Sequence, residues 1–406
     1  MDKEIILLAM VKLNHHYQKL IDKPFGNQAE KRVAQCIKEH PSAVLLHLTA
    51  SDMPLPPPAS ILSALLDASQ GLAASPPPIE DLLSLRKAIA SSYANIHADE
   101  IFISPSARST LAELQEIFSI ENRIAIPDPC DPAILDVHVM AGRTRPLLKT
   151  GLYGGVTYLS CTEQNNLQPQ LPNCPVDLIY LSSPHNPTGV ALDKALLTQW
   201  VQYAKKHQAI ILYDSSYQAF ISSDAPRSIY EIEGAHEVAI EVRSLAKMGA
   251  FAPLRCAYAV IPQSLKVQDA GARRSVHALW TRRLETRDPS VTYPIQKAAA
   301  ALFTSQGKKQ AAQLIHTSQT QALTLLTGLR ALGYTVYGGV DSPYIWCKTP
   351  SKITSWNFFE FLLEHVHIVT TPGIAFGKGG DGYIRFSAFT KPEVISESLS
   401  RLKKLA

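Results

Sequence analysis

Several signals that would point to other classes of protein are missing from this 406-residue sequence. No apolar run reaches the roughly 18 residues that a membrane span needs. The N-terminus has only a brief apolar patch and no small-residue cleavage site, so it does not resemble a signal peptide. The formal net charge is only +4, and no basic tract typical of nucleic-acid binding occurs. The six cysteines have no Cys-x-x-Cys spacing, which indicates free thiols in a reducing compartment. We therefore expect a cytoplasmic protein with no metal site and with neither nucleic acid nor membrane as a partner.

The composition is that of a folded globular protein, with 46% hydrophobic and 18% charged residues. Between about residues 100 and 262, short apolar runs alternate with amphipathic helical patterns. This alternation predicts an α/β fold with a mainly parallel sheet covered by helices on both faces. The predicted strands are 101–103, 124–126, 178–181, 210–213 and a run beginning at Val238, followed by a further run from Cys256 to Ile261.

The two ends of the chain have a different character. Helical spacing dominates up to about residue 45, and a strand-like run follows at 43–48. Beyond residue 285, helices lead into alternating strand patterns, which predicts a smaller α+β domain. We expect an N-terminal arm with part of the small domain at 1–48, a large domain at 49–285 and the rest of the small domain at 286–406.

Polar residues follow three of the predicted strands at the points where the strands end. Ser106–Arg108 opens a helix after the first strand, so its backbone N–H groups can cradle a phosphate. Asn186 lies in a Pro-rich turn, and Asp214 and Tyr217 follow a later strand. Because the carboxyl ends of parallel strands meet at one edge of a sheet, we expect these side chains to line one ligand crevice.

The segment around Lys247 carries the strongest chemical signal. Lys247 follows an apolar strand, with Ser244 three residues before it and Arg255 eight residues after it. Burial lowers the pKa of a lysine and makes the amine a nucleophile for carbonyls. Serine and arginine are residue types that bind phosphate. The plainer interpretation is a surface lysine in a turn between two strands.

The other candidates also have plainer interpretations when each is taken alone. Ser106 can be an ordinary helix cap, which is the commoner role of a serine there. Asp214 can be a turn residue and Tyr217 a core tyrosine. Arg385, on a predicted strand near the C-terminus, can bind a carboxylate by a bidentate contact or form a surface ion pair.

Four motifs, in their order and spacing, resemble those of class I/II aminotransferases, which are pyridoxal 5'-phosphate (PLP)-dependent transferases of fold type I. They are SSPHNPTG at 182–189, YDSSY at 213–217, SLAK…LR from 244 to 255, and TPGIAFGKGGDGYIRFS at 371–387. The resemblance extends from about Phe25 to the C-terminus. Within the family it is nearest to the LL-diaminopimelate aminotransferases.

This resemblance implies a role for each candidate residue. Lys247 is the catalytic lysine that forms a Schiff base with PLP, and Asp214 is the partner of the pyridine nitrogen. Asn186 and Tyr217 lie at the phenolic oxygen, and Arg385, with Asn186, binds the substrate. The phosphate is bound by Ser106, Ala107, Arg108, Ser244 and Arg255.

The chain departs from the family pattern on the side that faces the substrate. Ser51 replaces a glycine, Pro76-Pro77-Pro78 replaces a Tyr-Gly-Pro, and Lys23 stands where the family has a tyrosine. Asp131 replaces the aromatic residue that stacks on the cofactor ring. Either Asp131 pairs with a cation such as Lys23 or Arg108 and leaves the ring weakly held, or it recognises a positive group of the substrate. The first alternative is favoured.

The resemblance implies transfer of an amino group between an amino acid and a 2-oxo acid by a PLP-dependent homodimer. Because the substrate-facing residues differ, two alternatives stay open. The chain can catalyse another PLP reaction on an amino acid, such as elimination, oxidation or racemisation, or it can be a degenerate homologue without catalytic activity.

Overall fold

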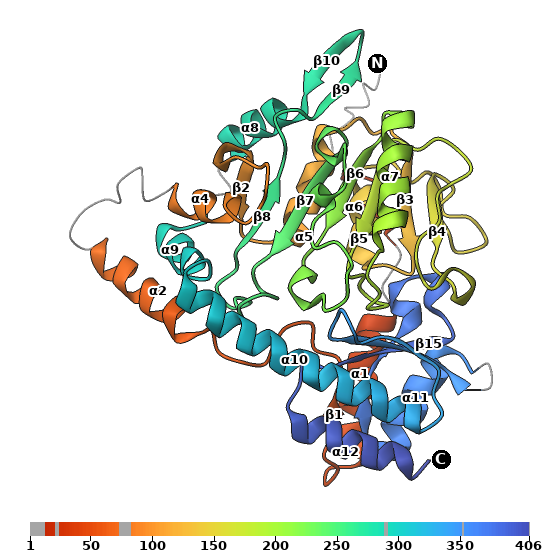
Figure 1. The fold of residues 1–406 in the computed structure, drawn as a ribbon. Coiled ribbons are helices and arrows are strands. Elements are labelled where there is room, and N and C mark those ends of the chain that lie inside the picture. The colour runs from red at the N-terminus through yellow and green to blue at the C-terminus, as the bar shows by residue number, and fades with distance from the viewer. Residues whose placement is uncertain (1–12, 21–23, 73–82, 288–290, 351–352, 406) are drawn as a thin grey trace, which may run out of the picture.

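The computed structural model describes residues 13–20, 24–72, 83–287, 291–350 and 353–405. Its largest element is a seven-stranded sheet, the centre of the upper part of Figure 1. The strands, in spatial order, are β2 (Ile101–Ser104), β8 (Ala257–Val260), β7 (Ala239–Ser244), β6 (Ile210–Asp214), β5 (Leu178–Ser182), β3 (Ile124–Asp128) and β4 (Val156–Ser160).

The sheet is mainly parallel, as the sequence predicts. Strands β4, β3, β5, β6 and β7 run parallel, and only β8 is antiparallel to its neighbours β2 and β7. Every residue of β5 is buried, which explains why the strand is a continuous apolar run. The register pairs Ser182 with Asp214 and Asp214 with Val242, so the ends of β5, β6 and β7 lie side by side.

Helices cover both faces of this sheet (Figure 1). On one face α5 (Ala107–Leu114), α6 (Pro132–Met140) and α8 (Val276–Arg287) share a core with β7 and β8. On the other face α7 (Lys194–His207) buries Leu197, Trp200, Val201 and Ala204 against β5 and β6. The apolar residues of α7 recur at helical spacing, so a single side of the helix faces the sheet.

A smaller unit lies below the large sheet in Figure 1. It contains a four-stranded antiparallel sheet, and its core also takes in β1 (Leu46–His47), which pairs with β13 (Ile368–Val369). The domain limits at 48 and 285 stay a prediction. The sheet consists of β11 (Val336–Gly338), β12 (Tyr344–Lys348), β15 (Tyr383–Ser387) and β14 (Thr371–Pro372), and its helices are α11 (Ser355–Val366) and α12 (Pro392–Lys403).

A long helix, α10 (Ser305–Ala331), runs from the large sheet to the smaller unit (Figure 1). The predicted helix from Gln296 to Leu332 is therefore two helices, since α9 (Tyr293–Ala301) ends four residues before α10 begins. Thr304 caps α10 by accepting a hydrogen bond from the Gly307 N–H. None of the described helices is long and apolar enough to cross a membrane.

Several elements were not predicted from the sequence. Helix α2 (Ala59–Gly71) follows the first proline cluster directly and packs against α9. By contrast, the short helix α4 (Ser84–Ala90), which packs there too, lies within the amphipathic helix that the sequence predicts after the second proline cluster, with Leu85 and Ile89 buried. The hairpin of β9 (Lys266–Asp269) and β10 (Ala272–Ser275) projects from the large sheet (Figure 1). Its residues are mostly polar, so it contains no apolar run that would indicate strands. Helix α1 (Pro24–Glu39) lies within the predicted N-terminal helical region.

Gly189 lies where the turn after β5 meets the smaller unit. Its φ is +72°, a value that favours glycine, and a Cβ on it would collide with the backbone oxygen of Tyr344 in β12. The backbone also approaches Gly338 closely. The glycine of the Asn-Pro-Thr-Gly sequence is thus required where the large sheet and the small sheet touch.

We predict that Gly189→Ala destabilises the protein more than Gly271→Ala. Both glycines have a positive φ, but nothing lies within 4 Å of a Cβ on Gly271. The control measures the backbone cost alone, about 1–2 kcal/mol, and the collision at Gly189 adds about 1–3 kcal/mol. Urea unfolding of both variants provides the comparison. Equal losses would mean that the contact with Tyr344 relaxes at no cost.

Candidate active site

One cavity of about 230 Å³ lies at the carboxyl ends of β5, β6 and β7. Arg385 is joined to it by a hydrogen bond of 2.7 Å from Nη1 to the Asn186 side-chain oxygen. The structure therefore brings every candidate residue to one site, as expected from the strand ends. The candidate residues that line the cavity are Ser106, Ala107, Arg108, Asn186, Asp214, Tyr217, Ser244, Lys247 and Arg255.

Asp214 ends β6 and presents its carboxylate to the cavity. One oxygen accepts a hydrogen bond from the Ser216 N–H and the other from the Tyr180 hydroxyl. Burial raises the pKa of the Asp214 carboxyl above its ordinary value, although these hydrogen bonds oppose the shift. Among the described residues no cation lies within 4.0 Å of it. The protonated ring nitrogen of PLP, the cofactor that the family resemblance implies, would supply the missing positive charge.

Lys247 lies in the turn after β7 with a side chain that is only 13% exposed. Its ammonium forms an ion pair with Asp52 and donates to the backbone oxygen of Ser51. It also lies 5.6 Å from the centre of the Tyr217 ring. The lysine is therefore partly buried, which contradicts the surface interpretation. Its amine must leave Asp52 before it can attack a carbonyl.

A phosphate-type site lies at the start of α5. The Ser106 hydroxyl oxygen caps the helix by accepting from the Ser109 N–H at 3.5 Å, so the plainer interpretation of Ser106 as a cap is also correct. The N–H groups of Ala107 and Arg108 belong to the first turn, which has no intrahelical acceptors for them. They are available to an anion at the positive end of the helix.

Two further residues complete the anion-binding side of the cavity. Ser244 ends β7 and its hydroxyl oxygen accepts from the Ala246 N–H at 3.3 Å. Arg255 has a φ of +58°, which costs a non-glycine residue about 1–2 kcal/mol. It lines the cavity and forms no ion pair with a described carboxylate. The chain thus holds an unpaired guanidinium beside the start of α5.

Asp131, the most pronounced departure from the family pattern, pairs with Arg108. The distance from Arg108 Nη2 to Asp131 Oδ2 is 2.7 Å, and the other Asp131 oxygen caps α6 through the Ala133 N–H. Of the two alternatives, the structure has the pairing that the sequence analysis favoured. Asp131 nevertheless still lines the cavity. Lys23, the other cation considered, and Pro76–Pro78 lie outside the described residues.

Arg385 is buried, with 6% of its surface exposed. Its guanidinium donates to Asn186 and to the backbone oxygen of Thr49, and it lies 4.2 Å from the centre of the Tyr344 ring. Its Nε is buried without a hydrogen-bond partner. No described carboxylate lies within 4.0 Å of the guanidinium, so the interpretation as a surface ion pair is wrong. A buried, uncompensated cation fits the carboxylate of a ligand.

Tyr217 is a buried residue whose hydroxyl shares a 2.7 Å hydrogen bond with that of Tyr344. Burial, together with Tyr344, raises the pKa of Tyr217 well above its ordinary value, so the hydroxyl stays protonated. Asn186 uses its side-chain oxygen to accept from Arg385, which leaves its NH₂ group to donate into the cavity.

Sequence reasoning missed three contacts that shape the site. The sequence analysis did not single out Asp52, which pairs with Lys247, or Tyr344, which shares a hydrogen bond with Tyr217. Asp128, at the end of β3, accepts a hydrogen bond from the Gly379 N–H at 2.9 Å and so holds the loop before β15 against the large sheet. All three join residues far apart in the chain, so no local spacing indicates them.

Comparison with known proteins places the chain in a family. The model of "aminotransferase class I and II" matches residues 43–402. The chain is 41% identical to an LL-diaminopimelate aminotransferase of Desulforapulum autotrophicum, over 97% of this chain and 99% of that protein. It is 39% identical, with the same coverage, to one of Methanosphaera stadtmanae.

A solved structure agrees with these relatives. The L,L-diaminopimelate aminotransferase of Chlamydomonas reinhardtii superimposes with a TM-score of 0.91 at 35% identity, over 98% of this chain and 99% of that one. The predicted fold type I is confirmed. On these grounds the chain belongs to the class I and II aminotransferases and is an aminotransferase similar to the LL-diaminopimelate aminotransferases.

Proposed function

We propose that this aminotransferase uses PLP and that LL-diaminopimelate is its amino donor, with a 2-oxo acid as the acceptor. One observation carries the proposal. A single cavity holds a carboxylate without a cation at Asp214, a partly buried amine at Lys247 and an anion-binding helix start at Ser106–Arg108. These are the three groups that the ring nitrogen, the aldehyde and the phosphate of PLP require.

When bound, PLP supplies an aldehyde and an electron-withdrawing ring. Asp214 would keep a proton on the ring nitrogen, and Asn186 and Tyr217 would donate to the phenolic oxygen. Ser106, Ala107, Arg108, Ser244 and Arg255 would hold the phosphate. The Lys247 amine, once free of Asp52, would take the proton from the substrate Cα.

Arg385 would bind the α-carboxylate of the substrate and Asn186 would orient the guanidinium. This contact would fix the Cα–H bond relative to Lys247, which is the orientation that proton transfer requires. LL-diaminopimelate is proposed because the 39% and 41% identical relatives carry that name. A homodimer is proposed on family resemblance alone.

The central test is covalent labelling of Lys247. We expect borohydride reduction of the PLP-loaded protein, followed by peptide mapping, to place the label on Lys247. Lys247→Arg should lose the label and the activity, whereas Lys378→Arg, a control beside the Asp128 contact, should keep both. A label on another lysine would overturn the assignment. No label at all would favour a homologue without catalytic activity.

Arg385→Ala should weaken substrate binding strongly. Loss of one partner of a buried charged contact costs about 2–5 kcal/mol, so the dissociation constant for LL-diaminopimelate should rise about 30-fold or more. The spectral change of the PLP-loaded protein on addition of substrate gives the constant. Arg330→Ala, an exposed position on α10, is the control. An unchanged constant in Arg385→Ala would remove Arg385 from the site.

Asp131→Asn should strengthen PLP binding about threefold to tenfold. Asparagine caps a helix as well as aspartate does, so only the charge that competes for Arg108 is lost, a contribution of about 1 kcal/mol. Asp131→Tyr should add ring stacking to this gain. The PLP dissociation constant and the turnover are measured together, with Glu121→Gln as the control for loss of a surface charge.

The two readouts separate the roles of Asp131. Tighter PLP binding with equal or better turnover supports a relaxed ring site. Unchanged PLP affinity with lost turnover supports recognition of a positive substrate group instead. If neither quantity changes in either variant, Asp131 does not contact the cofactor or the substrate.

A further inference from the structure

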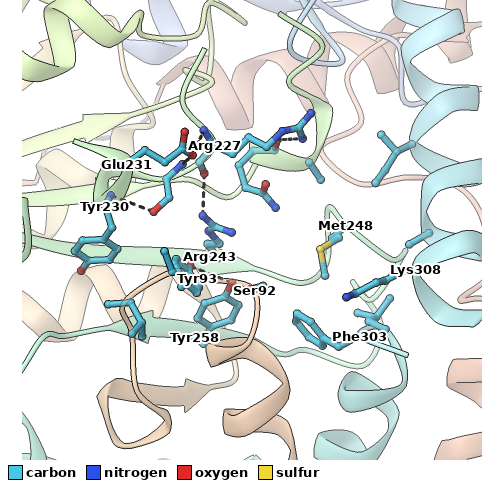
Figure 2. Close-up of a pocket in the computed structure, with 18 of the residues that line it drawn as sticks. Ser92, Tyr93, Arg227, Tyr230, Glu231, Arg243, Met248, Tyr258, Phe303 and Lys308 are labelled. Atoms are coloured by element: carbon cyan, nitrogen blue, oxygen red, sulfur yellow. Dashed lines mark hydrogen bonds between the residues drawn. The ribbon is translucent and has the colours of Figure 1, made fainter. Parts of the chain in front are cut away.

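A second and larger pocket lies on the opposite face of β7 and β8 from the candidate active site. Its volume is about 490 Å³, within the range of roughly 300–1,000 Å³ that small-molecule sites occupy. No residue lines both cavities. Figure 2 shows its walls, which come from the loop after α4, residues 218–231, strands β7 and β8, and the start of α10.

The alternation of side chains along β7 separates the two sites. Ser244 points to the candidate active site, and Arg243, its neighbour, points to the second pocket. Glu241 lies behind Arg243 and is fully buried. Its carboxylate is 2.6 Å from Arg243 Nε and accepts from the Tyr93 and Ser228 hydroxyls, also at 2.6 Å. Glu241 therefore neutralises the charge of Arg243, and Arg243 forms the polar base of the pocket.

Two cations at the mouth of the pocket are not balanced. The Arg227 guanidinium donates to the backbone oxygens of Gln218 and Ile221 and forms no ion pair with a described carboxylate. Lys308, on α10, points toward the pocket in Figure 2, and its ammonium has no hydrogen bond or ion pair within the described chain. Glu231 also lines the pocket, but its carboxylate accepts from the backbone N–H groups of Arg227 and Ser228.

The wall beside Lys308 is apolar (Figure 2). Met248, Phe303 and Ile315 are half-buried, and Leu302 and Ala311 are buried. An occupant that matches these walls would place an anionic group near Lys308 or Arg227 and an apolar body against Phe303 and Met248. Unneutralised cations beside an apolar wall are the features that bind amphipathic anions.

We propose that this pocket is a second binding site, separate from the catalytic one, for a small organic carboxylate with an apolar body. Met248 contacts such a ligand and directly follows Lys247 in the chain. The turn after β7 thus borders both sites, which makes the pocket a place where a ligand can influence the catalytic lysine. The proposal does not depend on the identity of the amino donor.

Calorimetric titration of the PLP-loaded protein with 4-phenylbutyrate tests the site. We expect binding at one site per chain, and at least about tenfold weaker binding of the uncharged 4-phenylbutanamide. Lys308→Gln should weaken binding of the carboxylate about threefold to tenfold, the size expected for an exposed charge pair. Lys309→Gln removes the neighbouring charge, which does not line the pocket, and should leave binding unchanged.

Two further variants locate the probe. Ala312→Phe fills the pocket from an exposed position of α10 and should abolish binding without lowering the melting temperature. Arg385→Ala should bind the probe as the wild type does. Loss of binding in Arg385→Ala, or full binding in both Ala312→Phe and Lys308→Gln, would overturn the proposal.

Sedimentation of the same proteins excludes one more occupant. We expect the wild type and Ala312→Phe to sediment alike, as homodimers. If Ala312→Phe changed the oligomeric state, the pocket would be a contact between subunits and the proposal would be wrong. A failed probe titration leaves the Lys247 labelling result unaffected, so the two proposals are tested independently.

Discussion

The register of β6 between β5 and β7 is the constraint on which the candidate active site depends. It sets Asp214 beside Ser182 on one side and Val242 on the other. A shift of β6 by one residue would turn the Asp214 side chain to the opposite face of the sheet, away from the cavity. Because every residue of β5 is buried and all but the last of β6 are too, such a shift would also expose the core. Packing of the sheet thus fixes the geometry of the site.

Two buried or partly buried charges in the site, Asp214 and Arg385, have hydrogen bonds but no opposite charge within 4.0 Å among the described residues. Burial raises the pKa of Asp214 in the folded protein above its pKa in the unfolded chain. The ionised carboxylate therefore lowers the free energy of unfolding at a pH above the unfolded-state pKa, and this loss of stability disappears as the pH falls and the carboxyl is protonated. Arg385 is a buried guanidinium without a carboxylate. Each group becomes stable when a ligand brings the opposite charge. Under the proposed function, the protonated ring nitrogen of PLP and the α-carboxylate of the amino acid would bring these two opposite charges.

The sequence predicted the fold and the site well where the signal was local. Apolar runs located β2, β3, β5, β6 and β7, and strand-end positions brought Asp214, Asn186 and Lys247 to one cavity. Contacts across long separations were not predictable. The Lys247–Asp52 pair spans 195 residues, and no spacing encodes it. Strand β4 and the polar hairpin β9–β10 were missed because all their residues except Leu159 are exposed or half-buried, so their sequences lack a continuous apolar run.

The effect of Asp131 on the site follows from the size of the interaction free energies involved. The side chain of Arg108 is 68% exposed, and a pair so exposed contributes at most about 1 kcal/mol. Under the proposed function, a dianionic phosphate at the start of α5 would interact with the same guanidinium, with the first-turn N–H groups and with Arg255 together, so it would displace Asp131 from Arg108. Without a stacking aromatic residue at position 131, the free energy of PLP binding would be less favourable by roughly a further 0.5–1.5 kcal/mol. Neither loss alone would abolish PLP binding, because the proposed phosphate and ring-nitrogen contacts do not involve residue 131. The departure at residue 131 is therefore compatible with the proposed function, in which it would weaken PLP binding without abolishing it.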